Sequence, residues 1–427
     1  MKEKIRIGCG AGFSGDRLDP SIVLVEKGNL DYLVLECLAE RTIGLAQKRK
    51  LQDPTQGYDP LLERRIDSLL ELLLARQTKL ITNMGAANPL AAGQKVIDIA
   101  KSKKLKIKVA VLTGDDVLHL IEPVERSVSA NAYLGADGIL EAIKTDADVI
   151  ITGRVADPSL FIAPMIHEFD WPMNDYTLMG RATVIGHLME CAGHITGGYF
   201  ADPGRKDVPD MAQLGHPFAD VSKDCSAVIS KVEGTGGVIN LMTAKEQLLY
   251  EVENPHQYFT PDVVADFTSV RLKQVGENRV AIEGGSGSEK PGNYKVSVGY
   301  QAFWLGEGEI TYAGSNAVAR AKLAGETVRQ RLANVVKDIR VDLIGMNSVH
   351  GDRFHNNVQP YEVRLRVAGK ADNMKTAQLV GEEVEALYTN GPGGGGGVRK
   401  YVNEVIGIVS TLIPRNKVRY EVKLLES

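Results

Sequence analysis

Five short clusters of glycine, acidic, amide and basic residues contain the side chains best suited to chemistry, and each cluster directly follows an apolar run. The clusters are GAGFSGDR (10–17), ECLAERT (36–42), NMGAANP (83–89), TGDDV (113–117) and TGRVADPS (152–159). Their carboxylates can move protons, and their amide and guanidinium groups can hold an oxygen on which negative charge develops. The clusters therefore predict a site for acid–base chemistry.

The first cluster holds Gly10, Gly12 and Gly15 in a GxGxxG pattern, and Glu36 ends the next predicted strand. In dinucleotide-binding folds, such glycines let the backbone approach a pyrophosphate, and the acid binds a ribose hydroxyl. The following helix, however, has its best start at Asp19-Pro20, which moves its N-terminus away from the loop and weakens an anion site there. Three interpretations stay open: an NAD-type site, a turn that admits another ligand, and a structural turn.

The acids Glu36, Asp115 and Asp116 are candidates for proton transfer. Glu36 either acts as a general acid or base whose proton affinity is tuned by burial, or forms a structural ion pair. One of Asp115 and Asp116 can cap the following helix, which leaves the other for catalysis or for a hard cation. We expect Glu36 or Asp115 to be the base, and the presence of a metal stays open.

Four further residues are candidates for binding the substrate. The Asn83 amide can donate to a carbonyl or carboxylate, and Gly85 permits a close approach, although both residue types are also common in turns. Arg154 can clamp a carboxylate or phosphate with two hydrogen bonds. Asp157, which precedes a proline, can join that site or cap a helix. We include all four in the predicted substrate-binding set, together with Gly10, Gly12, Gly15 and Asp116.

His194 is the candidate acid. Glu190 and His194 lie four residues apart, so on a helix they share one face and can form a hydrogen bond. An imidazole oriented by an acid is suited to proton transfer, whereas a satisfied core histidine is the structural alternative. The spacing is not HExxH, so it does not predict zinc. Two more glycine loops, at 233–237 and 391–397, can hold anions through their N–H groups or serve as flexible connections.

The elements that must position these residues are those of an α/β fold. Short apolar runs alternate with helical patterns, which is typical of a mostly parallel sheet with helices on both faces. Predicted strands span 5–9, 32–35, 80–82, 109–112 and 149–151, and predicted helices span 60–77 and 89–101. Ligands of such sheets bind beyond the carboxyl ends of the strands. We therefore expect Glu36, Asn83, Asp115, Arg154 and Asp157 to line one pocket.

The later part of the chain predicts an antiparallel addition and a small second domain. Runs at 268–272 and 280–283 flank a Gly-Glu-Asn turn and predict a hairpin. Further elements are a helix at 317–335, a strand at 340–344, a strand at 362–367, a helix at 374–387 and a hairpin that turns at 414–416. We predict an α/β catalytic region at 1–345 and an α+β domain at 350–427.

Composition excludes several classes of protein. The chain has 427 residues, of which 44% are hydrophobic and 24% charged, as in ordinary globular proteins of more than one domain. A net charge of -4 argues against a nucleic-acid partner, and no apolar run is long enough for a membrane span. The first residues lack a signal peptide, so we expect a cytoplasmic protein. The four cysteines lack CxxC spacing, which predicts neither a zinc cage nor a disulfide framework.

Several strings together resemble the AtuA-like acyclic terpene utilisation family. They are GAGFSGDR, DYLVLECLAERT, TNMGAANP, VLTGDDV, TGRVADPSL, GHLMECAGHITGG and VEGTGG, and they extend over most of the chain to about residue 350. The C-terminal part resembles the small ferredoxin-like domain that accompanies such proteins. The resemblance implies a role in the breakdown of branched isoprenoid or related acids through CoA thioesters. It supplies no catalytic residue.

We expect an enzyme that acts on a small molecule, namely a branched acyl-CoA or the corresponding carboxylate. The expected reaction adds or removes water, or cleaves a carbon–carbon bond, at a hydroxylated carbon. CoA would enter as part of the substrate, other cofactors stay open, and we expect a homo-oligomer. The alternatives are an NAD(P)-dependent oxidoreductase that uses the GAGFSG loop, and a non-catalytic accessory subunit of a catabolic carboxylase.

Overall fold

The chain forms two compact units. The computed structural model describes residues 2–122, 124–354 and 359–427. Unit 1 comprises Met1–Gly299 and Ile408–Ser427, and unit 2 comprises Tyr300–Gly407. This division differs from the expected 1–345 and 350–427. It differs because two long strands, β14 (Asn293–Ala313) and β17 (Gly396–Pro414), each contribute residues to both units.

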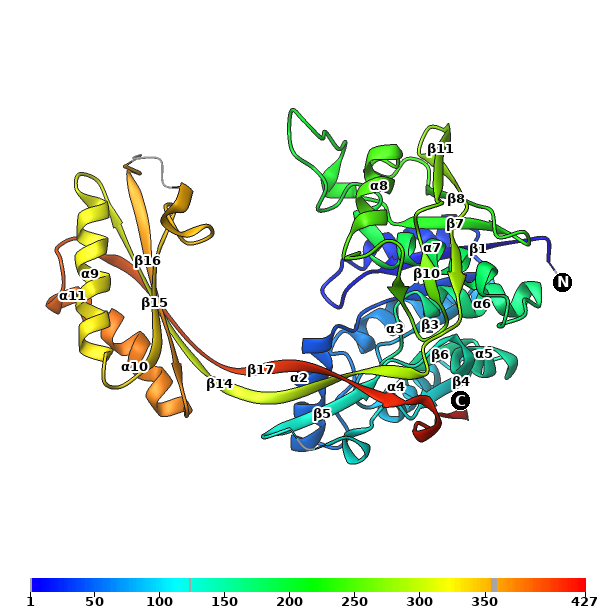
Figure 1. The fold of residues 1–427 in the computed structure, drawn as a ribbon, viewed down its shortest axis with the longest axis horizontal. Helices are drawn as coiled ribbons and strands as arrows, with labels where there is room; N and C mark the ends of the chain where they lie inside the picture. Colours follow the sequence, from blue (N-terminus) through cyan, green and yellow to red (C-terminus); the bar gives the residue numbers. More distant parts are fainter. Residues whose placement is uncertain (1, 123, 355–358) are drawn as a thin grey trace. The chain divides into compact units, whose positions relative to one another are not determined.

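A mixed sheet, ten-stranded in the described part of the chain, is the framework of unit 1 (Figure 1). Its central strands β1, β2, β3, β6 and β4 are parallel and match the five predicted strands, whereas the flanking strands are antiparallel. The mostly parallel sheet that we expected is thus parallel only at its centre. In spatial order the strands are β11 (Arg271–Gly276), β12 (Arg279–Glu283), β8 (Ala227–Lys231), β7 (Pro217–Ser222), β1 (Lys4–Ala11), β2 (Tyr32–Leu35), β3 (Lys79–Thr82), β6 (Val149–Thr152), β4 (Lys108–Thr113) and β18 (Glu421–Glu426).

The C-terminal strand completes this sheet. β18 pairs antiparallel with β4, so that Val422 lies opposite Leu112. The predicted hairpin that turns at 414–416 is wrong, because the strands on the two sides of this turn do not pair with each other. A turn does follow β17, at the short 3-10 helix η5 (Arg415–Lys417), but β17 belongs to the sheet of unit 2 and β18 to that of unit 1.

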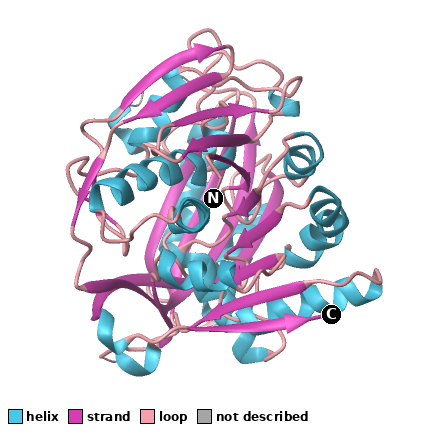
Figure 2. Ribbon diagram, turned by 90° about the vertical axis from the view of Figure 1, so that its right-hand side faces the viewer, coloured by secondary structure: helices cyan, strands magenta, loops and turns pink. Residues whose placement is uncertain are grey.

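Helices cover both faces of the large sheet, as predicted (Figure 2). Helices α1 (Asp19–Lys27), α3 (Leu62–Arg76) and α4 (Pro89–Ser102) bury Leu24, Leu69 and Val96 against one face. Helices α5 (Ala136–Lys144), α6 (Ser159–Phe169) and α7 (Tyr176–Glu190) bury Ile139, Phe161 and Met179 against the other face. Each such side chain contributes roughly 1.5 to 3 kcal/mol when fully buried. The two hydrophobic cores fix the strands whose ends carry the site.

Smaller elements complete unit 1. Strand β5 pairs with β14, and α7 packs against a small sheet of order β13-β10-β9. These elements are α2 (Glu40–Gln52), α8 (Leu241–Leu249), β5 (Ser127–Ala132), β9 (Tyr258–Phe259), β10 (Val264–Asp266), β13 (Ser286–Ser288), and the 3-10 helices η1 (Leu118–Leu120), η2 (Ala192–His194) and η3 (Met211–Gln213). No helix within the described residues is both long and apolar enough to cross a lipid bilayer.

The sheet of unit 2 has the order β15-β16-β14-β17, and β16 pairs antiparallel with both β15 and β14. The helices of unit 2 bury Val328 and Val380 against Ile310 and Leu365 of the sheet. Along the chain the elements are β14, α9 (Ala317–Leu332), β15 (Lys337–Ile344), η4 (Gly351–Phe354), β16 (Glu362–Ala371), α10 (Met374–Glu385), α11 (Leu387–Asn390) and β17. This β-α-β-β-α-β order is that of ferredoxin-like domains. The order starts at β14, well before the expected boundary at residue 350.

Candidate functional site

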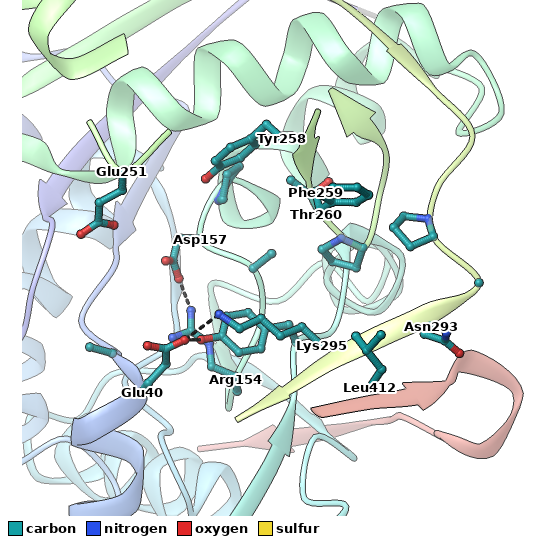
Figure 3. Close-up of a pocket in the computed structure, with 17 residues that line it drawn as sticks. Glu40, Arg154, Asp157, Glu251, Tyr258, Phe259, Thr260, Asn293, Lys295 and Leu412 are labelled. Atoms are coloured by element: carbon teal, nitrogen blue, oxygen red, sulfur yellow. Dashed lines mark hydrogen bonds and ion pairs between the residues drawn. The ribbon is translucent and has the colours of Figure 1, made fainter. Parts of the chain in front are cut away.

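Two cavities of unit 1 share part of their walls. The histidine cavity has a volume of about 570 Å³, and its wall includes Gly12, Asp16, Glu36, Glu190, Cys191, His194 and His216. The lysine cavity has a volume of about 740 Å³, and its wall includes Glu40, Tyr133, Arg154, Tyr258 and Lys295 (Figure 3). Ala39, Asp157 and Glu251 line both cavities. We treat the two cavities as one candidate site.

The strand-end clusters lie around these cavities in two layers. Glu36 and Asp157 line the histidine cavity, while Arg154 and Asp157 line the lysine cavity. Asn83 and Asp115 line neither cavity and are buried behind the wall. The clusters therefore lie close together, as the sheet topology predicts. Of the five side chains, however, only those of Glu36, Arg154 and Asp157 line one of the two cavities.

Glu36 directly follows β2 and is held through one of its two oxygens. The Asn83 amide nitrogen donates to Glu36 Oε1 at 2.8 Å, and the Leu38 backbone N–H donates to the same oxygen at 2.9 Å. Burial, followed by the negative charge of Asp157, raises the pKa of Glu36 well above its usual range, and Arg154 opposes this shift. A neutral carboxyl that accepts two hydrogen bonds at Oε1 carries its proton on Oε2. Oε2 is therefore the atom available to a ligand.

Asn83 positions Glu36 rather than a substrate. Its Oδ1 accepts the Cys37 N–H at 2.7 Å while its Nδ2 donates to Glu36. Both ends of the amide thus fix the turn after β2. This arrangement does not favour the oxyanion-binding role that we expected for Asn83.

Arg154 follows β6, and its guanidinium is bound by the protein itself. Nε and Nη2 donate to the Val155 carbonyl at 2.8 and 2.5 Å, Nη1 donates to the Leu38 carbonyl, and Nη2 also donates to Asp157 Oδ1. Arg154 is 1% exposed, whereas the Asp157 side chain is 37% exposed. Its guanidinium carbon lies 4.5 Å from the centre of the Tyr133 ring. Arg154 therefore holds Asp157 toward the cavities and has little capacity to clamp a substrate carboxylate.

The glycine loop already contains an acceptor for its N–H groups. Asp16 Oδ2 accepts from Gly12 N at 2.6 Å and from Phe13 N at 3.3 Å. Helix α1 begins at Asp19, as predicted, so its N-terminus is displaced from the loop. A pyrophosphate at this loop would have to displace a carboxylate and would be repelled by it. This geometry disfavours the NAD-type interpretation.

Packing explains glycine at Gly12 and Gly10, whereas the only close contact at Gly15 is the exposed ring of Phe13. A Cβ at Gly12 would lie 2.5 Å from the carbonyl carbon of Cys191 at the end of α7. Gly10 has a similarly close neighbour in Leu35, and Gly15 lies against the ring of Phe13. Of the three, only Gly12 lines a cavity. The loop is therefore at least a structural turn that brings Gly12 to the histidine cavity.

The cluster after β4 is structural in its contacts. Asp115 Oδ2 accepts from Asn131 Nδ2 at 2.8 Å and from the Arg154 N–H at 3.0 Å, and burial raises the pKa of Asp115 to about 6. Asp116 Oδ1 accepts the Leu118 N–H at 3.2 Å and so begins η1. Gly85 packs so tightly that a Cβ would lie 2.4 Å from the Thr152 carbonyl oxygen. No cluster of three potential metal-ligating side chains occurs here or elsewhere in the described residues.

The end of α7 places two buried acid–base groups, Glu190 and His187, in contact with each other. Glu190 Oε1 lies 2.8 Å from His187 Nδ1, so the predicted pairing of Glu190 with His194 is wrong. Burial raises the pKa of Glu190 well above its usual range and lowers the pKa of His187 to about 4. Helix α7 ends at Glu190, which places His194 in η2 instead of one turn farther along the same helix.

Two histidines face the histidine cavity. His194 stacks on the Tyr199 ring with centroids 5.3 Å apart, and burial lowers its pKa. His216 Nδ1 lies 3.0 Å from the Gly10 carbonyl oxygen, which can only accept, so Nδ1 carries the proton. His216 was missed because its sequence signal is a single histidine before an apolar strand, a pattern that predicts no particular role.

The lysine cavity combines one charged side with an apolar side. Glu40 Oε1 accepts from Tyr133 Oη at 2.8 Å and from Lys295 Nζ at 2.7 Å. Figure 3 shows Glu40 and Lys295 beside Arg154 and Asp157, with Tyr258 and Phe259 across the cavity. The site can therefore hold an apolar chain against the rings while a polar group of the same molecule reaches the carboxyls. Proton transfer to or from such a molecule is the chemistry that these groups can perform.

The whole site lies within a region that one protein family shares. No curated protein and no solved structure matches the chain. A family model described as acyclic terpene utilisation family protein AtuA matches residues 5–424, a range that includes both cavities and every residue of the predicted site. The chain therefore belongs to the acyclic terpene utilisation family AtuA.

Proposed function

We propose that this protein is an enzyme of branched-chain or isoprenoid acid breakdown. It adds or removes water at a hydroxylated carbon of a branched acyl-CoA or the corresponding carboxylate, a lyase reaction of the hydratase type. Membership of an acyclic terpene utilisation family supports the substrate class. The observation that carries the reaction type is that Glu36 lines a cavity together with Asp157 and accepts both of its hydrogen bonds at Oε1.

The two carboxyls are suited to opposite roles. Burial and the charge of Asp157 raise the pKa of Glu36 well above its usual range. Burial raises the pKa of Asp157 too, but the ion pair with Arg154 opposes that shift and supports the ionised form. In the dehydration direction, Glu36 donates its proton to the leaving hydroxyl, which departs as water. Asp157 removes a proton from the neighbouring carbon. The electron pair of the broken C–H bond then forms the double bond. Hydration reverses these steps, and carbon–carbon cleavage would instead start with removal of the hydroxyl proton by Asp157.

These roles differ from those expected from the sequence. Asp115 has no access to either cavity, which argues against its use as a base. His194 is held between the Tyr199 and Tyr250 rings, and burial favours its neutral form. A neutral imidazole is a weak acid, so Glu36 is the better donor.

The lysine cavity supports binding of the rest of the substrate. Tyr258, Phe259 and Leu412 provide an apolar wall for a branched chain. Lys295 provides a cation for a carboxylate or for a thioester carbonyl, although Glu40 shares it. We assign the acyl group to this cavity and the reacting carbon to the wall near Asp157.

The first test is a reaction screen with purified protein. Branched enoyl and 3-hydroxyacyl CoA thioesters and the free acids are incubated without nicotinamide, and products are followed by mass spectrometry. We expect interconversion that gains or loses one water. Reduction of NAD(P) by a hydroxy acid, with no such interconversion, would replace the proposal by the oxidoreductase. Turnover of no substrate, combined with copurification of a carboxylase, would favour the accessory subunit.

A further inference from the structure

Unit 2 contains a cavity of its own that the proposed reaction does not use. Its volume is about 500 Å³, and its wall includes Thr311, Arg364, Gly394, Gly396, Gly397 and Arg399. All of these residues belong to unit 2. An inference about this cavity is therefore independent of the proposed function.

The wall of this cavity is cationic. The Arg364 side chain is 40% exposed, and its Nη1 forms a long ion pair with Glu309 Oε2 at 3.4 Å. Arg399 is exposed and forms no ion pair with the described residues. Two guanidinium groups share the wall with Thr311 and no carboxylate. The cavity therefore has the charge of an anion site.

Arg320 fixes the glycine loop without entering the cavity. Its Nη1 donates to the Gly393 carbonyl at 2.7 Å, and its Nη2 donates to the Ala313 carbonyl at 2.7 Å. Within the described residues, the Gly393 and Gly394 N–H groups donate no hydrogen bond. The loop is thus held in place while backbone donors stay available, as in backbone sites that bind anions.

The fold accounts for some of the loop glycines but not for all. Gly394 and Gly397 have φ of +78° and +70°, a conformation that favours glycine, and a Cβ at Gly395 would lie 2.7 Å from Ile310 Cδ1. Gly393 and Gly396 lack a positive φ, and a Cβ at either would meet nothing within 4 Å. Gly396 lines the cavity. A ligand that approaches the backbone closely accounts for glycine at a position where the fold does not require it.

We propose that this cavity binds a phosphate group, either free phosphate or the phosphate of a phosphorylated small molecule. Arg364 and Arg399 supply the two cations, Thr311 supplies a hydroxyl, and the glycine loop supplies backbone donors. A phosphate has oxygens for all three kinds of group, and arginine pairs with it through two parallel hydrogen bonds.

Isothermal titration calorimetry on the full chain at low salt tests the site, with sodium phosphate in one arm and ADP in the other. We expect saturable binding with one site per chain. Tighter binding of ADP identifies an organic phosphate as the ligand, and tighter binding of phosphate identifies the free ion. Arg364→Ala and Arg399→Ala should each weaken binding at least about tenfold. Arg329→Ala, which removes an exposed arginine of α9 that pairs with Glu326, is the matched control and should leave binding unchanged.

Gly396→Ala separates ligand binding from folding. Because its Cβ would point into open space, this substitution should leave the melting temperature unchanged and yet weaken phosphate binding. Gly395→Ala, by contrast, should lower the melting temperature. Saturable binding of neither phosphate nor ADP would overturn the proposal. Binding that survives unchanged in Arg364→Ala, Arg399→Ala and Gly396→Ala would overturn it as well.

Discussion

Glu36 differs from the other carboxyls around the two cavities in how its oxygens are used. Both donors, from Asn83 and Leu38, point at Oε1, which leaves Oε2 for the histidine cavity. Glu40 and Asp157 instead form ion pairs with Lys295 and Arg154. Lys295 and Tyr133 lower the pKa of Glu40 against the effect of burial, and Arg154 opposes the rise that burial causes in the pKa of Asp157. Only an acid that keeps its proton can donate it to a leaving group. Glu36 is therefore the residue on which the proposed chemistry depends most.

Glu36→Gln keeps the shape of the side chain and removes its proton. We expect the turnover number to fall by a factor on the order of 100 to 10,000, the usual range for general acid–base catalysis, with little change in KM. Glu125→Gln removes an acid that is 91% exposed and should behave like the wild type. Steady-state kinetics of the three proteins check this. Full activity in Glu36→Gln would pass the role of acid to Glu190 or His194.

The same substitution should change the pH dependence of stability in a defined direction. The folded state raises the pKa of Glu36. The full contribution of Glu36 to the free energy of unfolding is therefore present at pH values below the pKa that Glu36 has in the unfolded chain. That contribution is lost as pH rises through the folded pKa. Urea denaturation should therefore show Glu36→Gln gaining stability relative to the wild type as pH increases. A constant difference across pH would mean that the pKa of Glu36 is not raised.

Arg154→Ala should destabilise the protein instead of only weakening substrate binding. The substitution removes a fully buried cation and leaves the Leu38 and Val155 carbonyls and Asp157 without their donor. Breaking a buried ion pair from one side typically costs about 3 to 5 kcal/mol. Chemical denaturation measures this loss, and adding Asp157→Ala should recover part of it. A raised KM with unchanged stability would return Arg154 to the role of substrate clamp.

At the scale of elements, Asp115 links the ends of β4 and β6. Its carboxylate accepts from Asn131 and from the Arg154 N–H, and its pKa rises from 3.8 to about 6. Between these values the folded state holds a proton that the unfolded state has released. The wild type should thus lose about 3 kcal/mol relative to Asp115→Asn as pH rises from about 4 to 7. Denaturation at several pH values checks this, and equal pH profiles would contradict it.

Local pattern was enough to predict the central strands and the helices between them. The runs at 32–35 and 149–151 coincide with β2 and β6 to within a residue, because apolar periodicity and flanking turns are local signals. Convergence of their ends followed from the parallel topology. How deeply each side chain is buried could not be predicted from the sequence. Asn83 and Arg154 look like ligand-binding groups in the sequence, but Asn83 binds Glu36 and Arg154 binds the Leu38 carbonyl, and both of these partners lie far away along the chain.

The Glu190 pairing shows the same limit at a helix end. A four-residue spacing predicts contact only while the helix continues, and α7 stops at Glu190. The i, i+3 partner His187 lies within the helix and was available to the same reasoning. His216 needed knowledge that β7 pairs with β1, because this pairing brings it to Gly10. Such antiparallel pairings leave no mark on the local sequence.

At the scale of the whole molecule, the boundaries of unit 2 can be tested by expressing fragments of the chain and measuring whether each one folds. Residues 300–407 contain β15, β16 and the parts of β14 and β17 that belong to unit 2. Residues 350–427, by contrast, lack β14 and β15 and the helix α9 between them. We expect the 300–407 fragment to fold, with a cooperative thermal transition by circular dichroism. The 350–427 fragment should not, because its β16 would lose both neighbours. A cooperative transition in the second fragment alone would restore the division expected from the sequence.

The central claim, that water is added or removed in the cavity that holds Glu36, has one direct test. A branched enoyl or 3-hydroxyacyl CoA thioester is incubated in heavy-oxygen water with the wild type, Glu36→Gln or Glu125→Gln, and the products are analysed by mass spectrometry. Heavy oxygen should enter the hydroxyl group rapidly with the wild type and Glu125→Gln, and slower by a factor on the order of 100 or more with Glu36→Gln. Incorporation at the same rate in all three proteins, or in none, would contradict the claim.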